Sequence, residues 1–132
     1  MRREVEYMVS KAQQKIAQIL LVDPSTSYKP LLLKALDDEP CADVQLVDVP
    51  DTFETLLVSA HWDAVIVVYA VSAEPIRVME AGEWETPLII LCDTQAEADE
   101  ADALTSPRIN DIVMKQQLKR VQFILRRDAR RH

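Results

Sequence analysis

Five short apolar segments, separated by helix-compatible segments, constrain the fold of this chain more than any other feature of its sequence. The predicted strands span residues 19–22, 44–49, 64–71, 88–91 and 112–114, and the predicted helices span residues 31–36, 50–59, 75–81, 95–104 and 116–131. Short apolar strands that alternate with helices predict a parallel sheet covered on both faces. Because crossover connections are right-handed, we expect an α/β fold with a doubly wound five-stranded parallel sheet in the order 2-1-3-4-5.

A sixth helical pattern precedes this unit. Val5, Met8, Val9, Ala12 and Ile16 recur at helical spacing among charged and amide residues, which predicts an amphipathic helix. We therefore expect two parts: an N-terminal amphipathic helix over residues 1–17, and one domain over residues 18–132 that ends in an extended basic helix.

The composition excludes several functional classes. The chain has a single glycine, Gly82, whereas glycine-rich phosphate-binding loops need at least two. A net charge of −7 argues against broad nucleic-acid binding by this domain. Cys41 and Cys92 match no metal-binding spacing, and together with the lack of a signal-peptide pattern they predict reduced thiols in a cytoplasmic protein. No apolar run approaches the roughly 18 residues of a membrane span.

The charge is distributed unevenly along the chain. Residues 37–111 contain 18 acidic and two basic side chains, a net charge of −16, whereas residues 115–132 contain seven basic and one acidic, a net charge of +6. One interpretation is solvated helix faces with a basic cluster at a helix end. The other is that the basic segment contacts an acidic partner or the acidic face of a second copy.

In a sheet of this type, functional residues gather at the carboxyl ends of the strands. The residues predicted at this edge are Asp23, the segment 68–72, Cys92, Asp93 and Lys115.

Four segments that lead to these positions resemble the receiver domain of bacterial response regulators, and the likeness covers about residues 18–127. They are Ile19-Leu20-Leu21-Val22-Asp23, Trp62-Asp63-Ala64-Val65-Ile66-Val67, Thr86-Pro87-Leu88-Ile89-Ile90-Leu91 and Asn110-Asp111-Ile112-Val113-Met114-Lys115. The resemblance implies a flavodoxin-like fold and a signalling role.

The resemblance also implies which groups should carry out phosphoryl chemistry. Receiver domains place two adjacent carboxylates after strand one, an acceptor aspartate at the end of strand three, a hydroxyl after strand four and a lysine after strand five. Three oxygen ligands then hold Mg²⁺, and the lysine and hydroxyl bind phosphoryl oxygens. This chain retains the first carboxylate as Asp23 and the lysine as Lys115, while Cys92 replaces the hydroxyl.

The two missing carboxylates determine the functional prediction. Pro24 replaces the second acid, and Val68 occupies the acceptor position, with Tyr69 there if the register shifts by one. One carboxylate is too few to hold Mg²⁺ against water, and valine cannot be phosphorylated. We therefore expect a degenerate, phosphorylation-independent receiver with no cofactor, no metal and no enzymatic activity.

Two alternatives stay open for the remaining polar residues. Asp23 and Lys115 are predicted to form an ion pair, either as a structural remnant or as an anion-binding site. Alternatively, Asp23, Asp93 and Lys115 line a crevice that binds a small ligand or a metal, as in a flavodoxin-like domain.

Signalling would depend on the face formed by the fourth helix, fifth strand and fifth helix of the domain. Its charged residues are Asp99, Glu100, Lys119, Arg120, Arg126 and Arg127. Opposite charges on one face suit a self-complementary homodimer or another protein partner. Because the last helix has no stop signal, we expect the chain to be the N-terminal regulatory domain of a larger regulator with a cyclic-di-GMP or transcriptional output.

Overall fold

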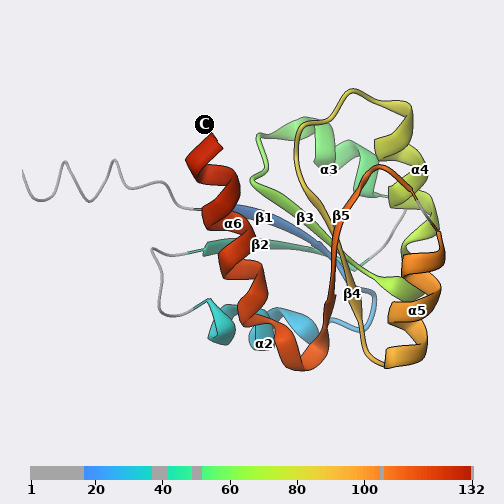
Figure 1. Ribbon diagram of the computed structural model, residues 1–132. Coiled ribbons are helices and arrows are strands. Elements are labelled where there is room, and N and C mark those ends of the chain that lie inside the picture. The colour runs from blue at the N-terminus through green and yellow to red at the C-terminus, as the bar shows by residue number, and fades with distance from the viewer. Residues whose placement is uncertain (1–16, 37–41, 49–51, 105, 132) are drawn as a thin grey trace, which may run out of the picture.

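The computed structural model describes residues 17–36, 42–48, 52–104 and 106–131, and in the last segment it describes side chains as far as Leu125. The elements, with η for a 3₁₀ turn, are β1 (Ala17–Val22), α2 (Tyr28–Ala35), β2 (Ala42–Val47), α3 (Phe53–Ser59), β3 (Ala64–Val68), η2 (Tyr69–Val71), α4 (Ala73–Ala81), β4 (Leu88–Cys92), α5 (Gln95–Ala103), β5 (Ile109–Met114), η3 (Lys115–Gln117) and α6 (Lys119–Arg131) (Figure 1). All strand pairs are parallel, in the order β2-β1-β3-β4-β5. The predicted fold class and strand order are confirmed.

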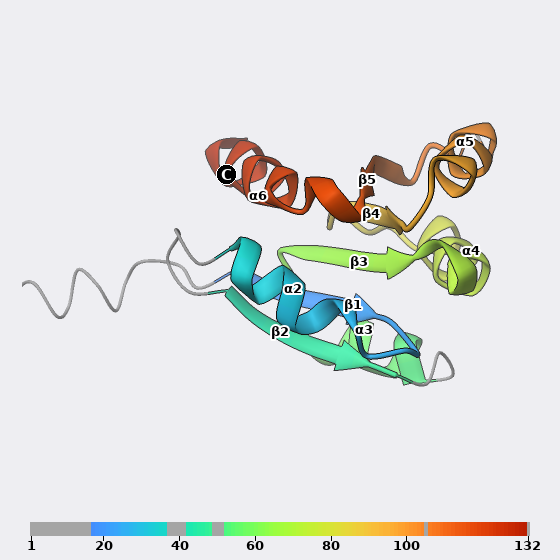
Figure 2. The same cartoon turned by 90° about the horizontal axis from the view of Figure 1, so that it is seen from below.

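Burial along the strands reflects their positions in the sheet. Every residue of β3 and β4 is buried, whereas β2 alternates between buried and more exposed positions. Central strands of a parallel sheet are covered on both faces and are therefore continuously apolar, while an edge strand can present polar side chains to water. Figure 2 shows the strands following one another from β2 to β5.

The helices complete two apolar layers, one on each face of the sheet. Leu32 of α2 and Val121 of α6 belong to one buried cluster, with alternate side chains of the strands. Phe53 of α3, Met79 of α4 and Ala101 of α5 belong to the other. Because successive strand residues point to opposite faces, each central strand contributes to both layers.

Each of the five strands differs from its predicted bounds at one end or both, and the largest changes are in β2, β3 and β5. The third strand, predicted over residues 64–71, ends at Val68, and η2 follows. Backbone hydrogen bonding turns the chain there, since the Ser72 amide donates to the Tyr69 carbonyl (3.1 Å). Val71 nevertheless packs against both clusters from the turn, so the apolar pattern continues past the end of the strand. β2 starts two residues earlier than predicted, at Ala42, and β5 three residues earlier, at Ile109.

The predicted N-terminal helix lies almost entirely outside the described residues. Its predicted last residue, Ala17, is the first residue of β1 and pairs with Ala42, so the strand starts inside the range assigned to the helix. Among the described residues, no helix has the length and apolar character needed to cross a membrane.

Candidate functional site

Asp23 follows β1 and is the most deeply buried acidic residue of the carboxyl edge, with 1% of its surface exposed. Its Oδ1 accepts hydrogen bonds from the Ser25 amide (3.0 Å) and the Ser25 hydroxyl (2.7 Å). Its Oδ2 accepts one from the Tyr28 amide (3.0 Å), at the first residue of α2. Both carboxylate oxygens therefore hold the β1–α2 turn and satisfy an amide that the start of the helix would otherwise leave unpaired.

The turn itself has a strained residue. Thr26 has a φ of 60°, a region that β-branched residues rarely occupy. The Thr26 amide donates to the Asp23 carbonyl (3.2 Å), so the turn closes on itself through both backbone and side chain of Asp23.

Tyr28 connects this turn to the other end of the site, and the sequence analysis did not identify it. Its hydroxyl donates to Oδ1 of Asp93 at 3.0 Å, directly after β4, and its ring belongs to the same buried cluster as Val68. Burial, followed by the hydrogen bond to Asp93 and the negative charge of that carboxylate, raises the pKa of Tyr28 far above its ordinary value. The sequence carries no signal for this contact, because residues 65 positions apart meet only in the folded sheet.

The predicted ion pair between Asp23 and Lys115 is wrong. Lys115 Nζ lies 3.7 Å from Oδ1 of Asp93 instead, the same oxygen that accepts from Tyr28. The β1–α2 turn encloses the Asp23 carboxylate, whereas Asp93 and Lys115 are about half exposed at the ends of neighbouring strands. The site therefore contains a Tyr28–Asp93–Lys115 bridge across its carboxyl edge.

The start of α5 fixes the backbone of Asp93. The Asp93 amide donates to Oε1 of Glu97 (2.7 Å), and the Glu97 amide donates to the hydroxyl of Thr94, which caps the helix (3.2 Å). These two hydrogen bonds satisfy the amides of Asp93 and Glu97 and hold Asp93 in place for the bridge.

An apolar side chain occupies the position that the resemblance assigns to the phosphate acceptor. Val68 ends β3, pairs in register with Leu91 and is 9% exposed. Tyr69, the alternative position, lies in η2, and its hydroxyl donates to Glu100 of α5, which raises the pKa of Tyr69. Neither side chain offers a carboxylate for phosphorylation.

The remaining groups do not fit a magnesium site. Mg²⁺ needs several oxygen ligands in near-octahedral geometry, but both oxygens of Asp23 already accept hydrogen bonds within the turn. Cys92 is fully buried, and burial, together with the negative charge of Glu97, raises the pKa of its thiol to about 11. In the described part of the chain, no group of three or more His, Cys, Asp or Glu side chains could hold a metal ion.

The predicted interaction face lies at the β5 edge of the sheet, with α5 and α6 on either side of that strand (Figure 2). The side chains of Asp99, Glu100, Lys119 and Arg120 are all exposed. Arg120 forms an ion pair with Asp111 of β5 (3.0 Å), and Gln95 Nε2 donates to Oδ1 of Asp99 (2.9 Å). The side chains of Arg126 and Arg127 lie outside the described residues, although their backbone is helical.

Comparison with known proteins identifies similarity only at the level of structure. The chain matches no protein-family model and no curated protein sequence. The receiver domain of the Francisella response regulator 1452 is similar with a TM-score of 0.70 and 12% identity, over 87% of this chain and 98% of that chain.

Two further solved structures share the fold. The receiver domain of the sensor histidine kinase PA1611 from Pseudomonas aeruginosa has a TM-score of 0.63 and 23% identity, over 86% of this chain and 97% of that chain. Full-length FixJ from B. japonicum has a TM-score of 0.67 and 20% identity, over 86% of this chain and 58% of that chain. With the strand order and the two helical layers, these similarities show that the chain has the fold of response-regulator receiver domains.

Proposed function

We propose that this domain is a signalling module that works without phosphorylation and without enzymatic activity, through contacts with other protein surfaces. The observation that carries the proposal is the apolar acceptor position, where Val68 ends β3. The hydrogen bonds of Asp23 support it further, because this carboxylate is engaged in the β1–α2 turn.

We also propose that the domain regulates a larger protein. Two solved structures that it resembles are longer than a receiver domain: it covers 58% of full-length FixJ and 54% of the response regulator DrrB from Thermotoga maritima. The regulated part would be an output domain of the cyclic-di-GMP or transcriptional class.

The charge distribution supports a homodimer as the mode of interaction. α5 has four acidic and no basic residues, and α6 has six basic residues and one acidic. A two-fold axis between these helices places α5 of each copy against α6 of the other, so that each contact pairs opposite charges.

A phosphodonor experiment tests the signalling proposal. Incubation with a small phosphodonor and Mg²⁺ should leave the mass of the intact protein unchanged, because the acceptor position lacks a carboxylate. A covalent addition of about 80 Da, one phosphoryl group, located by peptide mapping to the carboxyl edge, would overturn the proposal.

Light scattering at low and high salt tests the dimer. We expect a dimer at low ionic strength that dissociates as salt increases, because exposed charges are screened over about 10 Å at 0.1 M. Replacing Arg126 and Arg127 with Glu should abolish the dimer, whereas the matched charge reversal of Lys29 and Lys34 on α2 should not. A monomer at every salt concentration would contradict the dimer.

A further inference from the structure

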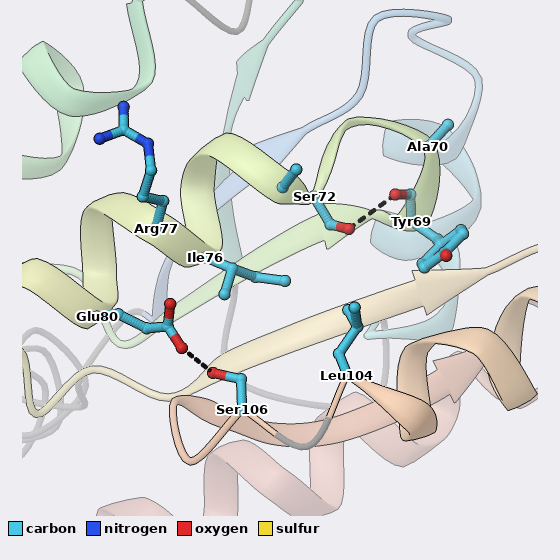
Figure 3. Close-up of a pocket in the computed structure, with 9 residues that line it drawn as sticks. Tyr69, Ala70, Ser72, Ile76, Arg77, Glu80, Leu104 and Ser106 are labelled. Atoms are coloured by element: carbon cyan, nitrogen blue, oxygen red, sulfur yellow. Dashed lines mark hydrogen bonds between the residues drawn. The ribbon is translucent and has the colours of Figure 1, made fainter.

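A pocket of about 430 Å³ lies between η2, α4 and the end of α5. Its apolar lining includes Ala70, Ala73, Ile76 and Leu104. Figure 3 shows Ile76 and Leu104 on opposite sides of the hollow. The Glu80 carboxylate accepts a hydrogen bond from the Ser106 hydroxyl (2.7 Å), which links α4 to the segment before β5 along one side.

The two helices that flank this pocket, α4 and α5, are acidic overall. Residues 73–104, from the start of α4 to the end of α5, contain nine acidic residues and one basic residue, Arg77, a net charge of −8. The charged residues of the lining are Arg77, which forms an ion pair with Glu74, and Glu80. An apolar hollow between two acidic helices fits a partner that presents an apolar side chain among cationic ones.

The chain carries such a side chain on α6. Phe123 is 63% exposed, an unusual position for a large aromatic ring that has no role in the core. Residues three and four positions away are its neighbours on a helix surface, and at Phe123 these are Lys119, Arg120, Arg126 and Arg127. The exposed ring therefore lies beside the exposed Lys119 and Arg120, and the sequence places two further basic residues one helical turn after it.

From this complementarity we infer that Phe123 of one copy occupies the pocket between η2, α4 and α5 of a second copy. The inference rests on the proposed dimer of α5 and α6, and it names the apolar anchor of that dimer. In a two-fold dimer the contact occurs twice, because each copy supplies one ring and one pocket. Buried aromatic anchors in such pockets contribute most of the binding energy at protein interfaces.

Two substitutions test the contact from its two sides. Phe123→Ser removes the ring, and Ala73→Trp fills the pocket from the exposed first residue of α4. Each should weaken dimerisation of the full chain at least tenfold, measured by sedimentation equilibrium at low salt. Val58→Ser is the matched control, because Val58 is 65% exposed on α3 and outside the proposed interface, and its dimer affinity should stay within twofold of the original. Circular dichroism melting verifies that each variant is folded.

Mixing the two variants distinguishes a direct contact from a general loss of structure. The Phe123→Ser copy keeps its pocket and the Ala73→Trp copy keeps its ring, so a mixture should form a heterodimer with one intact contact, tighter than either variant alone. Absence of this rescue, or a dimer affinity of Phe123→Ser within twofold of the original, would overturn the inference and leave the charge-based dimer standing. If the original chain is a monomer at every salt concentration, the proposed dimer itself is wrong.

Discussion

Replacing Asp23 with alanine tests directly whether this carboxylate is structural. The substitution removes three hydrogen bonds, two of them from backbone amides of the β1–α2 turn. The exposed Ser25 hydroxyl can turn to water, but the Tyr28 amide is buried at the start of α2. Hydrogen bonds to a charged group contribute about 1.5–3 kcal/mol each, and a buried donor left without a partner costs about 1–3 kcal/mol.

We therefore expect Asp23→Ala to lower the free energy of unfolding by about 3 kcal/mol, a large part of the roughly 5–15 kcal/mol of a typical domain. With a denaturant slope of about 2 kcal/mol per M, the urea midpoint should fall by about 1.5 M. Tryptophan fluorescence reports the transition, because Trp62 is buried and its indole donates to the Leu56 carbonyl (3.0 Å). Asp23→Asn, which keeps one oxygen acceptor, should be intermediate.

Asp102→Ala is the control, because Asp102 is exposed on α5. Its free energy of unfolding should differ from that of the original chain by less than about 0.5 kcal/mol. Millimolar Mg²⁺ should leave the midpoint of the original chain unchanged, since a ligand that binds the folded state raises its stability. An Asp23→Ala variant as stable as the control, or a midpoint that rises with Mg²⁺, would refute the structural role.

Three further predictions concern the same edge of the sheet and the turn after α4. In a Cys41→Ser background, Cys92 should resist a thiol reagent at pH 8 until urea unfolds the protein, because burial raises the pKa of its thiol to about 11; rapid modification of the native protein would contradict this. The raised pKa of Tyr28 means that the unfolded state loses its proton first, so the free energy of unfolding should fall as pH rises above about 10. Tyr28→Phe, which removes the bond to Asp93, should reduce this decline and cost about 1 kcal/mol at neutral pH; an unchanged pH profile would count against the bridge. Gly82→Ala should shift the tryptophan emission and cost about 1–3 kcal/mol, because a methyl group there would overlap the Trp84 indole; an unaltered spectrum would show that the ring moves aside freely.

The sequence predicted the sheet because its evidence is local. Runs such as Ile19–Val22 and Leu88–Leu91 are apolar on both faces, and only central strands of a covered sheet satisfy that pattern. The predicted end of β3 is wrong because the prediction used only this local apolar pattern. Val71 is as apolar as the strand residues and packs against the core from η2, so composition does not mark where hydrogen bonding with β4 stops.

The amino-acid sequence alone limits the chemistry available at the carboxyl edge. Val68 and Pro24 have no carboxylate in any conformation, and they occupy two of the positions at which the resemblance would place one. The pairing of the remaining groups depends on the fold: Asp23 bonds to its own turn, whereas Asp93 contacts both Lys115 and the Tyr28 hydroxyl. Side-chain identity and strand periodicity are properties of residues close in sequence. An ion pair depends instead on the distance between two atoms, which folding brings together from distant parts of the chain.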